Sequence, residues 1–155
     1  MEENIEFKIN DSNDFNNHWI AGFSDADASF QIKVVNKLKP SLPKAGPQAR
    51  PQGEIRLNFQ IDQKDNNVLL LIKEVFGGNI GYRNSQDTYY YGSTSFGSAK
   101  KVINYFDHFH LQSSKYINYL KWRKAYIIIQ EKNHLTETGL DKICKLKNSM
   151  NRYSV

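Results

Sequence analysis

The sequence has little cysteine and proline and lacks a long apolar run. Its 155 residues include a single cysteine, which excludes an internal disulfide and a cysteine-based zinc site. No apolar stretch is long enough to predict a transmembrane helix, and the first residues lack the basic and apolar segments of a signal peptide. We therefore expect a globular protein of a reducing compartment, without a membrane partner.

All four prolines lie between positions 40 and 51, in a basic segment that predicts a long loop. On either side of this loop, over 29–38 and 53–62, apolar and polar residues alternate with a period of two. This pattern is typical of half-buried strands. The segments 79–86 and 87–95 predict a second pair of strands, joined as a hairpin.

Apolar periodicity and capping residues predict five helices, over 15–27, 66–76, 99–109, 115–130 and 140–150. The expected N-caps of the last three are Ser98, then Ser113 or Ser114, then Thr138. The resulting order α-β-β-α-β-β-α-α-α indicates an α+β fold with helices on one face of an antiparallel sheet. The length suits one domain over residues 1–155.

Charge is divided unevenly along the chain. Residues 1–30 carry seven acids against one base, a net charge of −6, whereas the remaining residues carry 20 bases against 9 acids, a net charge of +11. A basic body favours a polyanionic partner and leaves the early carboxylates for another task. A solvated surface with an acidic tail would give the same charges.

The most informative segment is WIAGFSDADASF, residues 19–30. On a helix, Gly22 and Ala26 share one stripe, with Ala21 beside it and His18 one turn before it. A stripe of small residues lets a second helix backbone approach closely. Ordinary packing within the chain is the alternative interpretation.

Two carboxylates, Asp25 and Asp27, fall where this helix should end. There they oppose the helix macrodipole, at about 0.3–1 kcal/mol each, and a divalent metal would compensate them. Aspartate as a turn former is the alternative. Residues two apart on a helix point to opposite sides, so two packed copies of the helix would pair one carboxylate from each chain. This argument favours a symmetric dimer.

The segment IAGFSDADA, residues 20–28, resembles the LAGLIDADG motif of homing endonucleases. The identical positions are Ala21, Gly22, Asp25, Ala26 and Asp27. Ser24 and Ala28 depart from the motif, and Ala28 would cost on the order of 1 kcal/mol if its position needs a positive φ. The predicted element order resembles that of the family over nearly the whole chain. A single motif in 155 residues is similar to the homodimeric members.

The resemblance implies a saddle-shaped antiparallel sheet that faces double-stranded DNA. It also implies that a homodimer cuts both strands of a long, roughly palindromic site with Mg²⁺, for which Mn²⁺ or Ca²⁺ can substitute in binding. It makes Asp27 a metal ligand, with the main-chain carbonyl of Ala26, and gives Gln63 and Lys115 catalytic roles. A register slip would put Ser114 in place of Lys115, and Asn67 departs where the family has another basic helper.

The resemblance also implies two surfaces. The dimer interface comprises His18, Ala21, Gly22, Asp25 and Ala26. DNA contacts come from polar strand positions and from the hairpin and loop beyond them, because such side chains match base edges and phosphates. They are Gln31, Lys33, Lys37, Lys39, Arg56, Asn58, Gln60, Tyr82, Arg83, Asn84, Gln86, Tyr89 and Tyr91.

Three rival functions stay open at this point. The same fold could act as an intron RNA maturase, using basic residues away from the sheet such as Lys121, Arg123 and Lys124. It could be a DNA-binding protein that has lost cleavage, or a helical interaction protein without nucleic acid. Abundant residues with A·T-rich codons, without a targeting sequence, favour an organelle, above all a mitochondrion, with bacterial cytoplasm as the alternative.

Overall fold

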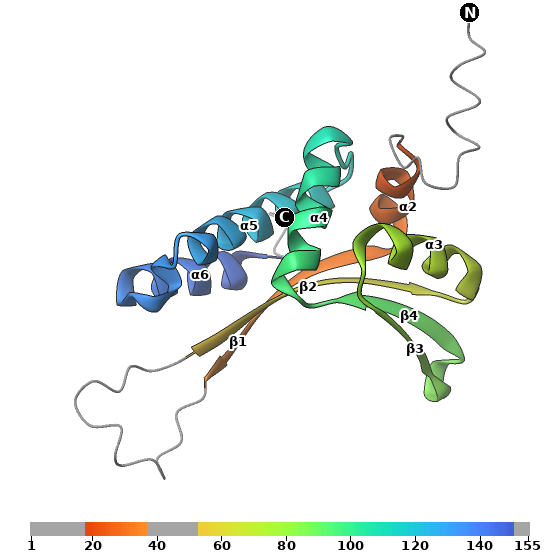
Figure 1. Cartoon of the computed structure of the whole chain (residues 1–155), viewed down its shortest axis with the longest axis horizontal. Coiled ribbons are helices and arrows are strands. Elements are labelled where there is room, and N and C mark those ends of the chain that lie inside the picture. The colour runs from red at the N-terminus through yellow and green to blue at the C-terminus, as the bar shows by residue number, and fades with distance from the viewer. Residues whose placement is uncertain (1–17, 37–52, 151–155) are drawn as a thin grey trace, which may run out of the picture.

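Four antiparallel strands form one sheet in the order β1-β2-β4-β3 in the computed structural model, which describes residues 18–36 and 53–150 (Figure 1). The long pair at one side joins residues on both sides of the proline-rich segment, and a hairpin completes the sheet. The strands are β1 Ala28–Asn36, β2 Gly53–Gln63, β3 Asn79–Arg83 and β4 Thr88–Ser93. The four predicted strands are confirmed in the described ranges.

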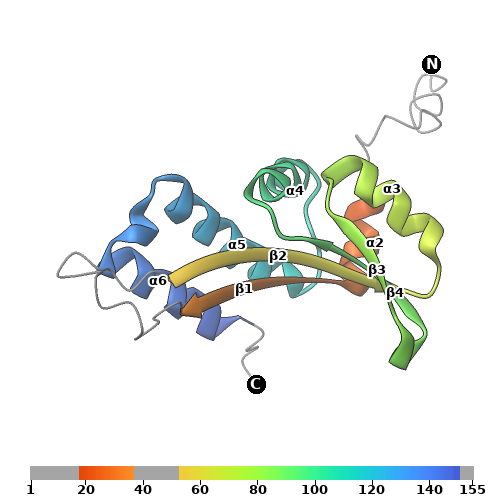
Figure 2. The ribbon, with the colours of Figure 1, turned by 60° about the horizontal axis from the view of Figure 1, so that its bottom comes forward.

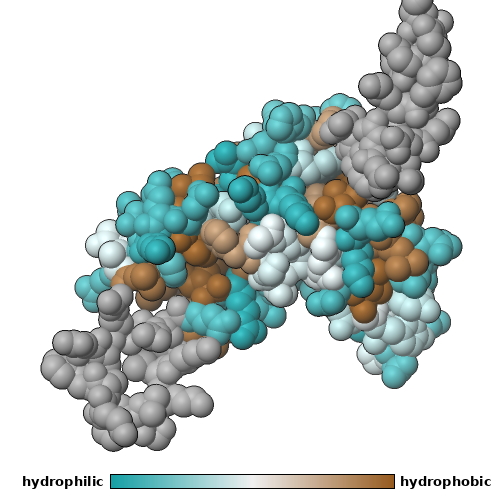
Figure 3. Space-filling model, viewed as in Figure 1, coloured by the Kyte–Doolittle hydropathy of each residue, from teal (hydrophilic) through white to brown (hydrophobic). Residues whose placement is uncertain are grey.

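Within the described residues, five helices accompany the sheet, and they correspond to the five predicted ones. They are α2 Trp19–Asp27, α3 Asn66–Phe76, α4 Phe96–His108, α5 Lys115–Gln130 and α6 Glu137–Ser149, with 3-10 turns η2 Asn84–Gln86 and η3 Asn133–Leu135. Figure 2 shows α3, α4 and α5 over one face of the curved sheet, and α6 contacts α5 and β1. This is the predicted α+β class. Within 18–36 and 53–150, the helices are too short or too polar to cross a membrane. Figure 3 shows hydrophilic and hydrophobic residues interspersed on the face that it views.

Two predicted N-caps are wrong by two or three positions. The cap of α4 is Ser95, whose hydroxyl accepts from the Ser98 amide at 3.1 Å. The Ser98 hydroxyl instead donates to the carbonyl of Phe76 inside the core. The cap of α6 is Thr136 rather than Thr138. Each helix extends toward an earlier hydroxyl because serines and threonines are closely spaced there, and the sequence offers several caps of similar quality.

The core lies between the helices and the sheet and is built around Phe30 of β1. Its ring centroid lies 5.0 Å from Phe59, 5.2 Å from Trp122, 5.4 Å from Tyr119 and 5.7 Å from Phe106. These five side chains come from four elements and are almost completely buried. Aromatic burial at this point therefore holds α4 and α5 against the sheet.

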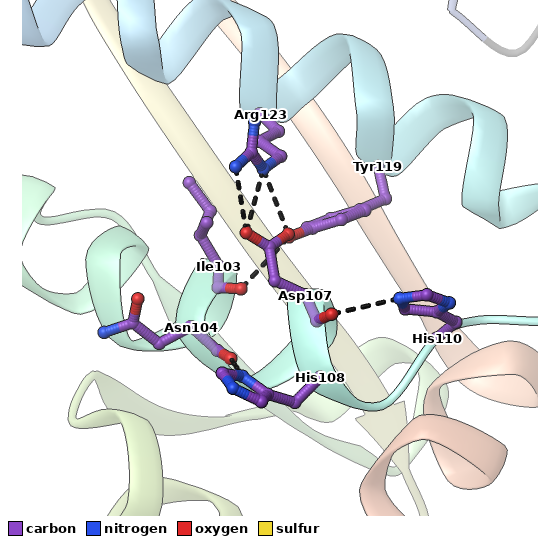
Figure 4. A network of polar contacts seen from close by, with 7 residues as sticks. All are labelled: Ile103, Asn104, Asp107, His108, His110, Tyr119 and Arg123. Carbon is purple, nitrogen blue, oxygen red and sulfur yellow. Dashed lines mark hydrogen bonds and ion pairs between the residues drawn. The ribbon is translucent and has the colours of Figure 1, made fainter.

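A polar network joins the end of α4 to α5 (Figure 4). The carboxylate of Asp107 accepts from Arg123 through Nε at 3.0 Å and through NH2 at 2.9 Å, and from the hydroxyl of Tyr119 at 2.6 Å. Partial burial raises the pKa of Asp107, but these hydrogen bonds and the Arg123 charge outweigh it, so the net pKa lies below its ordinary value.

Acid is expected to weaken this network. Because the folded-state pKa of Asp107 lies below its ordinary 3.8, its contribution to stability is complete above about pH 5 and is lost as the pH falls through the folded-state pKa. In urea unfolding, Asp107→Asn should therefore reduce the stability lost between about pH 5 and about pH 3. The control Asp141→Asn removes a 61% exposed carboxylate and should keep the wild-type acid slope. Equal slopes in wild type and Asp107→Asn would contradict the prediction.

Gly139 occupies a position in α6 that does not admit a side chain. A Cβ atom there would lie 1.8 Å from the carbonyl oxygen of Asn133, whereas at Gly97 of α4 it would meet no atom within 4 Å. We expect Gly97→Ala to raise the free energy of unfolding by about 0.5 kcal/mol and Gly139→Ala to lower it by more than about 1 kcal/mol. Thermal unfolding of both variants measures this, and stabilisation by Gly139→Ala would refute it.

Candidate active site and nucleic-acid interface

The chain passes directly from α2 into β1 at the motif. Asp27 is the last residue of the helix, and Ala28 follows with φ −91° and ψ 162°, an extended conformation. A positive φ is therefore not needed at Ala28, and the departure from glycine has no backbone cost. The Ala28 side chain is 2% exposed and belongs to the core.

The exposed carboxylate of Asp27 meets Gln63, the last residue of β2. The Gln63 Nε2 donates to Asp27 Oδ2 at 2.5 Å. The two residues are far apart in sequence, and the register of β1 against β2 places Ala28 opposite Ile61, so it brings the ends of α2 and β2 together. The structure thus joins two of the three predicted catalytic residues.

The third, Lys115, reaches the same helix end from the first turn of α5. Its Nζ donates to the main-chain carbonyl of Asp25 at 2.9 Å. The last carbonyls of a helix lack intrahelical partners and carry its negative dipole end. A lysine at the beginning of α5 opposes the dipole of its own helix, but here it compensates the dipole of α2. Ser114, the alternative from a register slip, is the N-cap residue of α5.

The carboxylate of Asp25 is hydrogen-bonded to groups of its own chain. It accepts from the amides of Gln112 at 2.9 Å and Ser113 at 3.0 Å, and from the Ser113 hydroxyl at 2.7 Å. Partial burial raises the pKa of Asp25, but the Ser113 hydroxyl, the two amides and Lys115 outweigh it, so the net pKa is lowered. Asp25 therefore holds the segment before α5, and the two carboxylates of the motif have different surroundings.

The donors near Asp27 fit a hard divalent cation. Its exposed carboxylate and the carbonyl of Ala26, in the last turn of α2, offer oxygen, which Mg²⁺ and Ca²⁺ prefer. Over 18–36 and 53–150 there is no group of three or more histidine, cysteine or acidic side chains that could hold a metal.

The outer stripe of α2 is open at Gly22 and Ala26. Both are exposed, and a Cβ at Gly22 would meet no atom within 4 Å. His18 is also exposed and packs edge-on against Phe109 with ring centroids 4.9 Å apart. Ala21 is different, because it is 3% exposed and its amide donates to the Tyr105 hydroxyl at 2.9 Å. The predicted place of Ala21 on the interface is wrong, since it faces α4 of its own chain.

Five of the predicted DNA contacts lie on the sheet face opposite the helices. Direct pairing puts Gln31 opposite Asn58 and Lys33 opposite Arg56, and Gln60 lies on the same face. Arg56 Nε donates to Glu54 at 2.8 Å. Asn58 is only 9% exposed, and its Oδ1 has no hydrogen-bond partner in the described part of the chain. This polar sheet face therefore carries amide and cationic groups at regular spacing.

The three hairpin tyrosines predicted to contact DNA face the helix side of the sheet instead. Tyr91 is fully buried, its hydroxyl donates to the carbonyl of Gly77 at 2.6 Å, and burial raises its pKa to about 12. Tyr89, which packs against the core, lies opposite Tyr82, with ring centroids 5.0 Å apart. Tyr91 as a DNA contact is wrong, and Tyr82 and Tyr89 lie on the helix side. Because three consecutive residues of β4 are tyrosines, the sequence does not show which of them face the helices.

Tyr90 and Asp62 also lie on the polar sheet face, although neither is among the predicted DNA contacts. The guanidinium carbon of Arg83 lies 4.4 Å from the Tyr90 ring centroid, and Arg83 NH1 donates to Asp62 at 2.8 Å. Asn84 and Gln86 lie exposed in the turn η2. Lys37 and Lys39 lie outside the described residues. Asp62 lies opposite Tyr90, and this pairing depends on the register of β2 against β4, which no local pattern in the sequence specifies.

Comparison with known proteins identifies the family. The profile of the family described as LAGLIDADG endonuclease matches residues 20–126. The chain is 64% identical over 145 residues to the Schizosaccharomyces pombe protein named "Uncharacterized cox1 intron-2 37.2 kDa protein", covering 94% of this chain and 41% of that protein. It is 29% identical to the Saccharomyces cerevisiae "Intron-encoded DNA endonuclease aI3", covering 88% of this chain and 38% of that one.

Solved structures give the same result. The structure of I-SmaMI bound to uncleaved DNA target in the presence of calcium ions aligns with a TM-score of 0.75 and 31% identity, covering 87% of this chain and 44% of that chain. The homing endonuclease I-TnaI aligns with a TM-score of 0.72 and 27% identity, covering 88% of each chain. By contrast, the chain spans under half the length of the two curated relatives from Schizosaccharomyces pombe and Saccharomyces cerevisiae. The motif, the sheet and the matched profile together show that the chain belongs to the LAGLIDADG endonuclease family.

Proposed function

We propose that this chain binds double-stranded DNA on its polar sheet face and cuts it, with a divalent metal, beside Asp27. The contact of Asp27 with Gln63, next to Lys115 at the end of α2, supports this more than any other observation. It places an exposed carboxylate at the end of the strands that carry the polar sheet face. One relative is named a DNA endonuclease, and I-SmaMI is bound to a DNA target in the presence of calcium ions, which supports the proposal.

The mechanism needs little from the chain beyond charge and orientation. A bound Mg²⁺ would supply a charge clamp for the scissile phosphate and lower the pKa of a bound water. Asp27 and the carbonyl of Ala26 would hold it. The Gln63 amide, fixed by Asp27, orients the attacking water, and Lys115 adds positive charge near the phosphate.

We propose further that a second copy of the fold covers the exposed stripe of α2. Twofold packing at Gly22 and Ala26 would bring two Asp27 carboxylates together and give a long, roughly palindromic target. The lengths of the relatives leave room for a second such unit within one chain, whereas I-TnaI has about the length of this one. Our proposal for this chain is the homodimer.

Gly22→Leu tests the second copy. Within one chain the added side chain meets open space, and leucine favours helix more than glycine, so the free energy of unfolding of the monomer should not fall. Self-association should weaken by on the order of tenfold or more, because the helix backbones can no longer approach. Light scattering over a concentration series measures this. An unchanged dimer, or a wild type that is monomeric with and without DNA, would contradict the proposal.

Cleavage is tested on a duplex that spans the uninterrupted cox1 exon junction, since a 64% identical relative is named for a cox1 intron. The names of relatives in cox1 and ND4 introns also support a mitochondrial context. Double-strand cutting should require Mg²⁺ or Mn²⁺ and stop with EDTA, while Ca²⁺ should support binding. If neither this duplex nor one selected from random sequences is cut with any divalent metal, the proposal fails.

The maturase alternative gains no support from its named residues. Lys121 Nζ donates to the carbonyl of Ser149 at 2.8 Å, and Arg123 is paired with Asp107. Only Lys124 of the three is exposed. DNA cleavage is therefore the function we propose.

A further inference from the structure

We propose that Asp62 determines sequence specificity on the polar sheet face, by fixing the orientation of Gln60 and Arg83 while opposing the phosphate backbone. The inference rests on the proposed DNA binding and deepens it. Asp62 is a carboxylate on a face otherwise rich in amides and cations. Its negative charge can only weaken the attraction of this face for a polyanion.

The carboxylate of Asp62 uses its two oxygens for two different donors. Oδ1 accepts from Gln60 Nε2 at 3.1 Å, and Oδ2 accepts from Arg83 NH1 at 2.8 Å. Gln60 belongs to the same strand, whereas Arg83 lies on β3, on the far side of β4. Asp62 therefore couples donors from two strands across the width of the hairpin.

Tyr90 holds the other side of Arg83. Its ring lies 4.4 Å below the guanidinium carbon, a cation–π distance, and Tyr90 lies directly opposite Asp62 in the pairing of β2 with β4. The ring also covers Gly81, where a Cβ would approach Tyr90 atoms to 2.4–2.7 Å. Glycine at position 81 thus makes room for the ring. The Arg83 guanidinium is oriented by a carboxylate at its edge and an aromatic ring beneath it.

Orientation of this kind matters for reading bases. Arginine and glutamine discriminate between bases through paired hydrogen bonds of defined direction, and a side chain already held in place loses less entropy when it binds. The side chains of Arg83 and Asp62 are 31% and 44% exposed, and Gln60 is also partly exposed. The remaining donors of the Arg83 guanidinium and of the Gln60 amide are therefore accessible. The negative charge weakens phosphate contacts, which carry no sequence information.

Asp62→Asn removes the charge and keeps the shape. A preferred duplex is first selected from a random pool with the wild-type chain, and affinities for it and for an unrelated duplex are then measured. We expect affinity for the unrelated duplex to rise about threefold and the ratio between the two affinities to fall about tenfold. Repeating the selection with Asp62→Asn should lose preference at one contiguous group of positions and keep the rest.

Asp87→Asn is the matched control. It removes one carboxylate from the same hairpin, where Asp87 contacts Tyr82 rather than Gln60 or Arg83, and asparagine also tolerates its positive φ of 48°. This control should leave the affinity ratio unchanged. Adding Arg83→Gln to Asp62→Asn should reduce the ratio less than the two single changes predict together.

The outcomes separate the two proposals. If the wild-type chain prefers no duplex at all, DNA recognition itself is refuted. If it selects a sequence but Asp62→Asn keeps both the affinity ratio and every base preference, Asp62 has no role in specificity. An equal fall in the ratio for Asp87→Asn would make the effect one of net charge and would also overturn the inference.

Discussion

Asp27→Asn is expected to abolish DNA cleavage while leaving duplex binding within about twofold of wild type. The asparagine side chain keeps the size of the aspartate and one oxygen, so α2, β1 and the polar sheet face stay in place. It lacks the negative charge that a divalent cation requires. Single-turnover cleavage should fall by on the order of a thousandfold or more, because both the charge clamp and the activated water depend on that cation.

Two variants control this result. Asp141→Asn, at a 61% exposed carboxylate of α6, should cut at the wild-type rate. Asp25→Asn should retain a hydrogen-bonding group near Gln112 and Ser113 but loosen the segment before α5, so it should lower stability as well as cleavage. If Asp27→Asn lost binding as completely as cleavage, Asp27 would be a structural residue and the proposed metal site would be abandoned.

Phe30→Ala is expected to lower the free energy of unfolding by about 3–5 kcal/mol. Phe30 is 1% exposed and its ring contacts four other aromatic rings, so its removal leaves a cavity that rigid neighbours cannot fill. A domain of this size is stable by about 5–15 kcal/mol. The variant therefore approaches the limit of folding, which urea unfolding monitored by tryptophan fluorescence can measure.

Phe96→Ala is the matched control. Phe96 is 41% exposed and stacks on Tyr126 with ring centroids 4.2 Å apart, so its loss should reduce stability by about 1 kcal/mol. A loss for Phe30→Ala no larger than that of Phe96→Ala would mean that the aromatic cluster does not hold α4 and α5 on the sheet.

Local patterns in the sequence were sufficient for the elements and much of the site. The period of two placed Gln31, Lys33 and Arg56 on one face, and the motif located Asp27 at the end of a helix. Caps were predicted less well, because Ser95 and Ser98 compete for the same role and only the packing of Ser98 against Phe76 decides between them. The predicted orientation of Tyr89 and Tyr91 was wrong for a similar reason, since three identical side chains in a row show no alternation of polar and apolar residues.

The fold class, the order of elements and the family can be predicted without the structure, because apolar periodicity and a short motif depend on neighbours along the chain. The hydrogen-bond partners of the two nearly adjacent carboxylates of the motif follow only from the folded structure. Asp25 is bound by Gln112 and Ser113, whereas Asp27 stays exposed and meets Gln63. Those partners lie far away in sequence. Long-range contacts of this kind follow from strand register and helix docking, and no local pattern contains them.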